Sequence, residues 1–509
     1  MKHIAHHFTY TAIAALFAAT SLTGNAQAQN SVPATPAAWS DTFKKDLDLA
    51  YQETLENHPG THDPHKPEFR KNLEAARNNA LALADQVKDA AGYQAAFNRF
   101  NVSLHDGHAG AQATLPPSLA PGLRWPGFMT VWRGDGLYVY ASESEQPAVG
   151  AKLVSCDGKQ IKDLVMENVF SYKGRSDEAG HWWYFARQLM IDYGNPFIQM
   201  PKQCVFSHQG KTLTHALSWQ PVTTNFETWR TRSHNGEILP TGLTEPKKNL
   251  LWVAMPNFQP DQAERETFNK MTQEIADHRD RALHAQAIVI DLRGNQGGSS
   301  EWSENFAEAL WGKSRVDRLM AAYSPNTDVW WRASRDNTSY VQSLVTIFAG
   351  ENRADTAAWA KRHADGMQAA LDKGDKFYIE SSTGPKAPAP TPGDAVPDNT
   401  VELKTPVYVI VPGQCASACL DALDVFTRFD NTKLIGAPSS ADSTYMEIRI
   451  KALPSGLARV VIPNKVYVNR ARAAGQIYTP AITVTDIAWS TENFLKVVEA
   501  DLLKSRQAR

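Results

Sequence analysis

Two stretches that lie far apart in the chain decide its fold. Residues 287–298 read AIVIDLRGNQGG, and residues 407–421 read VYVIVPGQCASACLD. Each opens with a short run of β-branched and aliphatic residues, typical of a fully buried strand, and then changes to small, turn-forming residues. After the second turn, apolar residues recur at helical spacing from Cys419 to Phe429. Both stretches therefore predict a strand followed by a tight turn that leads into a helix, an arrangement typical of catalytic sites.

Each turn carries groups suited to catalysis. Ser417 directly precedes the predicted helix, and a helix N-terminus favours a developing negative charge. In the first turn, Gly294, Gly297 and Gly298 let the backbone bend sharply and leave its amides unshielded, as an oxyanion hole requires. The alternatives, for each motif taken singly, are an ordinary glycine-rich loop and a serine that only caps a helix.

Taken together and in this order, the two turns resemble those of the S41 family of serine peptidases. This family includes C-terminal processing and tricorn-like proteases and carries a DLRxNxGG turn and a later SAxxE turn. The resemblance implies an α/β fold with a ClpP/crotonase-like ββα core. It also implies that Ser417 is the nucleophile and that the oxyanion hole uses the amide of Ala418 with that of Gly297 or Gly298.

The resemblance assigns the general base to His108. Processing proteases of the family place a lysine about 25 positions after the nucleophile, but Asp442 occupies that register here, and no lysine stands there. Residues 97–108, FNRFNVSLHDGH, resemble the LxDxH helix end from which tricorn-like relatives draw a catalytic histidine. Out of this context, His108 would be read as a capping or hydrogen-bonded histidine, and His105 is not expected to act.

The acid that would orient His108 has no counterpart at the position expected from the family. Tricorn-like relatives supply a late glutamate, but residues 466–480 contain no carboxylate. Glu447 is the acid that we expect in this role, with Asp442 as the other candidate. The alternatives are a solvated surface position for both acids and a site without a third member.

The N-terminus reads as an export signal. Residues 11–22 are largely apolar, and Ala26, Gln27 and Ala28 give the small-residue pattern that signal peptidase cleaves, so residues 1–28 are predicted to be a signal peptide. The apolar run is shorter than the roughly 20 residues that a bilayer span needs. The chain is therefore expected to be exported, periplasmic or secreted, without stable membrane insertion.

The remaining chain divides into three parts. Residues 29–120 predict a mostly helical region, interrupted at residues 58–60. Residues 121–220 predict short strands, and part of this region is similar to a PDZ-like domain. Residues 221–509 resemble the S41 catalytic α/β domain, with an insertion at about 313–404 between the two turns.

Composition narrows the function classes. The 509 residues are 42% hydrophobic and 21% charged, with a formal net charge of −2, so the chain has no polyelectrolyte character and nucleic acid is not an expected partner. After export, Cys156, Cys204, Cys415 and Cys419 could form two bridges in any of three connectivities. A Cys415–Cys419 bridge would clamp the nucleophile turn; the alternative is two buried apolar thiols. No metal or organic cofactor is expected.

These observations predict an exported serine hydrolase. We expect a peptidase that cleaves peptides or protein substrates through an acyl-enzyme on Ser417. The alternative is a catalytically inactive S41-like protein that binds an extended peptide or a small apolar ligand in the same cleft. An α/β-hydrolase esterase fits less well, because its nucleophile elbow has glycines where this chain has Cys415 and Cys419.

Overall fold

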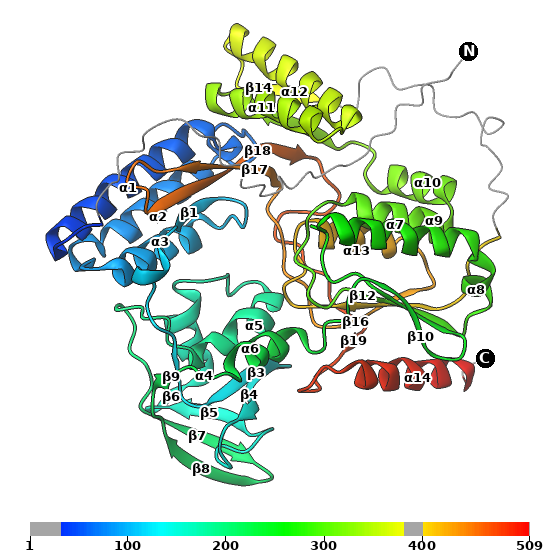
Figure 1. The fold of residues 1–509 in the computed structure, drawn as a ribbon, viewed down its shortest axis with the longest axis horizontal. Coiled ribbons are helices and arrows are strands. Elements are labelled where there is room, and N and C mark those ends of the chain that lie inside the picture. The colour runs from blue at the N-terminus through cyan, green and yellow to red at the C-terminus, as the bar shows by residue number, and fades with distance from the viewer. Residues whose placement is uncertain (1–31, 381–400, 508–509) are drawn as a thin grey trace.

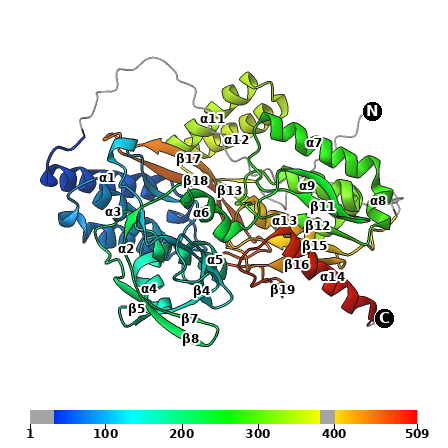
Figure 2. The same cartoon turned by 60° about the horizontal axis from the view of Figure 1, so that its bottom comes forward.

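The computed structural model describes residues 32–380 and 401–507 and has a mixed α/β architecture (Figures 1 and 2). The predicted signal peptide at residues 1–28 lies outside these ranges. Within them, no helix is long and apolar enough to cross a membrane.

The central sheet holds both motif strands side by side. Its strand order is β10-β11-β12-β15-β16-β19, and every neighbouring pair is parallel except β10 with β11. Because β12 and β15 are parallel neighbours, the turns that follow them emerge at the same edge of the sheet. The strands span β10 (Gly242–Lys247), β11 (Leu250–Ala254), β12 (Ala287–Asp291), β15 (Val407–Val411), β16 (Thr432–Gly436) and β19 (Ile482–Thr483).

Helices cover both faces of this sheet, which explains why β12 and β15 are continuous apolar runs. Ile288 and Val409 pack on the face covered by α7, α9 and α13, whereas Val289 and Ile410 pack on the face toward α14 (Figure 1). All ten residues of the two strands are buried. The helices are α7 (Gln262–Asp277), α8 (Arg279–His284), α9 (Glu301–Trp311), α13 (Ala418–Phe426) and α14 (Thr491–Gln507).

The N-terminal region is helical, as the sequence predicts, and leads into a second sheet. Helices α1 (Pro36–Asn57), α2 (Phe69–Leu81) and α3 (Ala90–Leu104) precede this antiparallel sheet, in which β1 and β17 both pair with β18. The β1–β18 pairing ties the chain just after His108 to the C-terminal half. The strands are β1 (Gly110–Ala113), β13 (Asp328–Arg332), β14 (Phe377–Glu380), β17 (Tyr445–Ala452) and β18 (Ala458–Val468).

Residues 124–235 form an antiparallel β unit with short helices, at the bottom of Figure 1. The main sheet has the order β3-β4-β5-β7-β8, with β6 paired to β5, while β2 and β9 form a separate pair. Its similarity to a PDZ-like domain stays a prediction. The elements are β2 (Arg124–Trp125), β3 (Phe128–Arg133), β4 (Gly136–Ser142), β5 (Lys152–Cys156), β6 (Lys159–Gln160), α4 (Ile161–Val165), α5 (Ala179–Phe185), β7 (Gln203–His208), β8 (Lys211–Ala216), β9 (Gln220–Pro221) and α6 (Phe226–Asn235).

The predicted insertion contributes to the second sheet. Strands β13 and β14 belong to it, and the helices around them pack at the top of Figure 1. These helices are α11 (Arg335–Gly350) and α12 (Ala354–Lys373), whereas α10 (Lys313–Tyr323) packs against α9.

Of the three possible cysteine connectivities, the structure has Cys156–Cys204 and Cys415–Cys419. The first bridge joins directly opposed residues of β5 and β7, with 48 positions between them in the sequence. The second closes the turn between β15 and α13 onto the first turn of α13, as the clamp interpretation predicts; we call this turn the nucleophile turn, after the predicted role of Ser417.

We predict that replacing both Cys156 and Cys204 by alanine destabilises the protein by about 2–4 kcal/mol, because that bridge restricts a long loop of the unfolded chain. Denaturant unfolding of the oxidised protein measures this. The matched control is Cys415→Ala with Cys419→Ala, whose loop is only four residues long and whose effect on stability should be smaller. Equal midpoints for wild type and the first variant would contradict the prediction.

Candidate active site

The glycine-rich turn after β12 is braced by a buried ion pair. Nη2 of Arg293 lies 2.6 Å from Oδ2 of Asp291, and Asp291 Oδ1 also accepts the backbone amide of Arg293 at 3.0 Å. The guanidinium donates to the carbonyl of Trp489 at 2.8 Å, which anchors the turn to the chain leading into α14. Both charges are paired and hydrogen-bonded, as burial demands.

Asn295 fixes the remainder of the same turn. Its buried side chain donates to the carbonyl of Met255 at 2.9 Å and accepts the amide of Gly297 at 2.8 Å. The amide of Gly298 has no hydrogen-bond partner among the described residues. The amide of Gly297 or that of Gly298 was expected at the oxyanion hole. Because the amide of Gly297 already donates to Asn295, the amide of Gly298 is the one that remains free to donate to a substrate oxygen.

The nucleophile turn holds Ser417 in an unusual backbone conformation. Its φ is +54°, a region that serine rarely adopts and that costs on the order of 1–3 kcal/mol. The side chain makes no capping hydrogen bond to α13, so the serine does not serve as an ordinary N-cap. Ala418 begins the helix, and its amide has no hydrogen-bond partner among the described residues.

The buried carboxylate of Asp442 holds this turn. Both of its oxygens accept the backbone amide of Ser417, at 3.0 and 2.9 Å, and Arg472 donates to Oδ2 at 3.2 Å. A hydrogen bond to a charged group contributes about 1.5–3 kcal/mol, which is of the size needed to offset the strain at Ser417. Asp442 thus holds Ser417 through the serine's backbone amide.

The two turns touch. A Cβ atom placed on Gly297 would lie 2.8 Å from Cβ of Ser417 and 2.6 Å from the carbonyl oxygen of Ala416. The φ of Gly297, +105°, is likewise suited to glycine alone. Only glycine allows this approach, which also brings the Cβ position of Gly297 to 3.0 Å from the amide nitrogen of Ala418.

Asp106 sets the position of the loop that carries His108. Its Oδ1 accepts the amide of His108 at 2.9 Å and the hydroxyl of Ser443 at 2.8 Å, while Oδ2 accepts Nε2–H of His58 at 2.8 Å. His58 is neutral because burial lowers its pKa, and its Nδ1 accepts the amide of Gly60. Burial acts to raise the pKa of Asp106, but the hydrogen bond from His58, the electrostatic attraction of His58 and His108 and the backbone amide of His108 together outweigh it, so the pKa is lowered. Asp106 is therefore an anion.

Ser417 and His108 line one cavity of about 1,290 Å³, a volume that includes space open to solvent. His105 and Asp442 also line it. No hydrogen bond joins the side chains of Ser417 and His108 in this structure. Such bonds are often long before substrate binds and tighten in the complex.

The structure does not bring Glu447 to this cavity. Glu447 lies in β17, inside the second sheet, with Oε2 3.5 Å from Nζ of buried Lys465. Glu447 and Asp442 are both buried, so the alternative of a solvated surface position is wrong for each of them. Nδ1 of His108 is buried, and no described residue accepts a hydrogen bond from it. No described acid thus acts as a third member through this nitrogen.

The cavity wall contains a second polar cluster, formed by Glu178, His181 and Ser440, that was not predicted from the sequence. Oε2 of Glu178 accepts the hydroxyl of Ser440 at 2.7 Å and the amide of Ala441 at 2.8 Å. His181 lies 2.9 Å from Ser440, but its Nδ1 accepts the amide of Arg175, so Nε2 carries the proton. Burial and the nearby Arg175 lower its pKa to about 4. His181 therefore donates to Ser440 and cannot serve as its base. The Glu-x-x-His spacing was the only available signal.

Residues 440–443 consequently join three parts of the chain. Ser440 and Ala441 bind Glu178 beside α5, Asp442 binds Ser417, and Ser443 binds Asp106. We call this short segment the junction segment. It fixes the position of the nucleophile turn relative to the loop that carries His108, which we call the histidine loop.

The residues that the structure describes contain no group of three or more His, Cys, Asp or Glu side chains able to hold a metal ion.

Comparison with known proteins shows which family and which solved structures the chain resembles. Residues 249–473 match the model of peptidase family S41. Mature CPAF has a similar structure, with a TM-score of 0.60 and 15% identity, covering 92% of this chain and 98% of that chain. The photosystem II D1 C-terminal processing protease is more distant, with a TM-score of 0.32 and 13% identity over 87% of this chain and 93% of that one. No curated protein matches the chain. The fold of mature CPAF thus extends over nearly the whole length.

We predict that Gly297→Ala lowers turnover by about 100-fold or more, because the new Cβ would displace Ser417 and Ala418 and disturb the donors around the hydroxyl. Steady-state hydrolysis measures the loss, and circular dichroism checks that the fold persists. The matched control is Gly350→Ala, where a Cβ atom meets nothing within 4 Å. Wild-type turnover in Gly297→Ala would show that the two turns do not form one site.

Proposed function

Because residues 249–473 belong to peptidase family S41, we propose that this serine-type peptidase cleaves its peptide substrates through an acyl-enzyme on Ser417, with His108 as general base. One observation carries the proposal. Ser417 is held in a strained turn by its backbone, its hydroxyl does not cap the helix, and it lines the same cavity as His108. A strained turn that presents a free hydroxyl is a recurrent feature of nucleophilic serines.

In the proposed reaction, Oγ of Ser417 attacks the peptide carbonyl carbon while its proton passes to the ring of His108. The amides of Ala418 and Gly298 then donate to the oxygen on which negative charge develops. His108 returns the proton to the departing amine as the C–N bond breaks, and a water molecule hydrolyses the acyl-enzyme by the same steps. The positive end of α13 adds to the stabilisation of that charge.

We predict that Ser417→Ala abolishes both peptide hydrolysis and covalent labelling by a fluorophosphonate while leaving the fold intact, since loss of a catalytic nucleophile removes many powers of ten in rate. Retained activity, or labelling at another serine, would contradict the assignment. If the intact wild-type protein binds peptides but neither cleaves them nor reacts with the fluorophosphonate, the alternative of a catalytically inactive peptide-binding protein is correct instead.

We predict that His108→Ala removes nearly all turnover, whereas His105→Ala, the matched control from the same cavity, has a mild effect. Steady-state hydrolysis of a peptide substrate measures the turnover of both variants, and a neutral base at residue 108 is required to accept the serine proton. Lys433→Ala and Lys451→Ala test the alternative of a lysine base. Loss of activity in either, with activity kept in His108→Ala, would overturn the proposed base.

The protein is also proposed to be exported to the periplasm or secreted. The small-residue pattern at residues 26–28 after an apolar run supports this, and so do two disulfides among the described residues, since disulfides persist in oxidising compartments. We predict that the mature exported protein begins at Gln29, which N-terminal sequencing determines. Met1 at the start of the exported protein would rule out cleavage.

A further inference from the structure

A second, smaller cavity adjoins the one that contains Ser417. It lies between α3, the end of the π-helical turn at Met166–Phe170 and the chain at residues 188–200, and its empty space, including part open to solvent, is about 620 Å³. Asn98, Tyr172 and Lys173 line both cavities. The two spaces are therefore neighbours along one wall.

Lys173 is the charge at the centre of this pocket. Its ammonium lies 3.7 Å from the ring centroid of Tyr193, and no carboxylate among the described residues forms an ion pair with it. Burial, together with the positive charges of Arg187 and Arg230, lowers the pKa of Lys173 to about 8. Arg230 is paired with Glu227 at 2.6 Å. The local excess of positive charge thus comes from Lys173 and from Arg187.

Arg187 strengthens that excess. It is only 2% exposed, and its Nε and Nη1 have no hydrogen-bond partner among the described residues. A buried guanidinium without a carboxylate raises the positive potential around it, since little water screens it. An anion entering the pocket would therefore be favoured over a neutral group.

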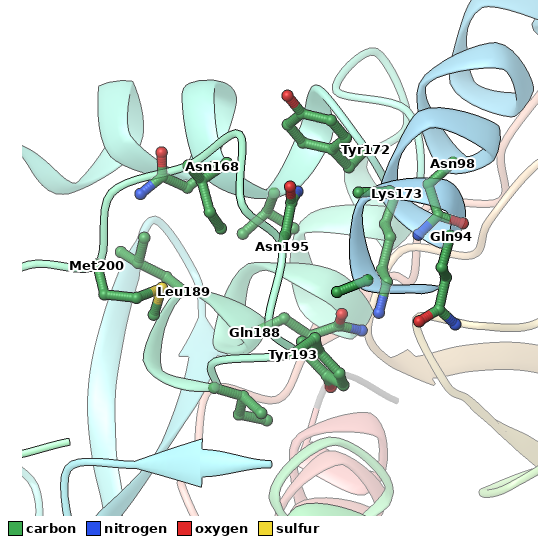
Figure 3. Close-up of a pocket in the computed structure, with 15 residues that line it drawn as sticks. Gln94, Asn98, Asn168, Tyr172, Lys173, Gln188, Leu189, Tyr193, Asn195 and Met200 are labelled. Atoms are coloured by element: carbon green, nitrogen blue, oxygen red, sulfur yellow. The ribbon is translucent and has the colours of Figure 1, made fainter. Parts of the chain in front are cut away.

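The remaining polar wall supplies hydrogen-bond donors. Figure 3 shows the Lys173 side chain running between Gln94 and Asn98 of α3 on one side and Gln188 and Tyr193 on the other. The side chains of Gln94, Asn98 and Gln188 bind no other described residue. An ammonium with carboxamide N–H groups around it matches the acceptor oxygens of a carboxylate.

We infer that this pocket is a substrate subsite for the side chain of an aspartate or glutamate, with Lys173 as its ion-pair partner. The inference rests on the proposed peptidase function and adds a preference for acidic peptides to it. Tyr172 and Asn98, which line both cavities, would form the passage through which the acidic side chain enters from the peptide.

The test uses pairs of synthetic peptides of about 14 residues that differ only by glutamate or glutamine at one position, scanned along a sequence that the wild type cleaves. At one position we expect kcat/KM to be about 10-fold higher for the glutamate peptide, as a partly desolvated ion pair provides. Lys173→Gln should bring this ratio close to one, Lys173→Arg should keep it above one, and Lys173→Glu should favour a lysine peptide instead. Because each ratio is taken within one variant, a general loss of activity does not alter it.

The matched control is Lys162→Gln, an exposed lysine of α4 that lines neither cavity, and it should keep the wild-type ratio. Glutamate-to-glutamine ratios near one at every position, in a wild type that cleaves peptides, would overturn the subsite and leave the peptidase function standing. The same holds if Lys173→Gln keeps the preference. A wild type that cleaves no peptide and takes no fluorophosphonate would overturn both.

Discussion

The hydrogen bonds between the carboxylate of Asp442 and the amide of Ser417 determine the position of Ser417, the proposed nucleophile. A serine with φ of +54° relaxes toward a commoner conformation unless something holds it. Asp442 does so at 2.9–3.0 Å from a buried position, with Arg472 beside it to balance the charge. The Cys415–Cys419 bridge closes the same turn from the other side. The hydroxyl is thereby left free for chemistry.

The position of Asp442 links the site to distant parts of the chain. Through its neighbours in the junction segment, the β unit is attached at Glu178 and the histidine loop at Asp106. Displacement of the junction segment would move the nucleophile turn and the histidine loop together, since both bind adjacent residues. The helical region, the β unit and the central sheet must therefore all be folded before the cavity has its shape.

Local sequence predicted the parts of the site that are contiguous in the chain. The apolar runs of β12 and β15 and the glycines after β12 have signatures of their own, and the structure has the predicted turns at one sheet edge. The partners of those turns could not be predicted, because they depend on contacts between distant segments. His58 lies 48 positions from Asp106, and Glu178 lies 262 positions from Ser440. The prediction that Glu447 orients His108 was wrong for the same reason, because the sequence does not show which face of β17 its side chain occupies.

The most direct test of this account is the rate at which a fluorophosphonate modifies Ser417 in Asp442→Ala compared with wild type, with the modified residue identified by peptide mass spectrometry. The account predicts an adduct on Ser417 in the wild type. It also predicts a much slower rate in Asp442→Ala, while circular dichroism shows a folded protein, because the turn is no longer held in its reactive conformation. Equal rates in the two proteins, or an adduct on a different serine, would contradict it.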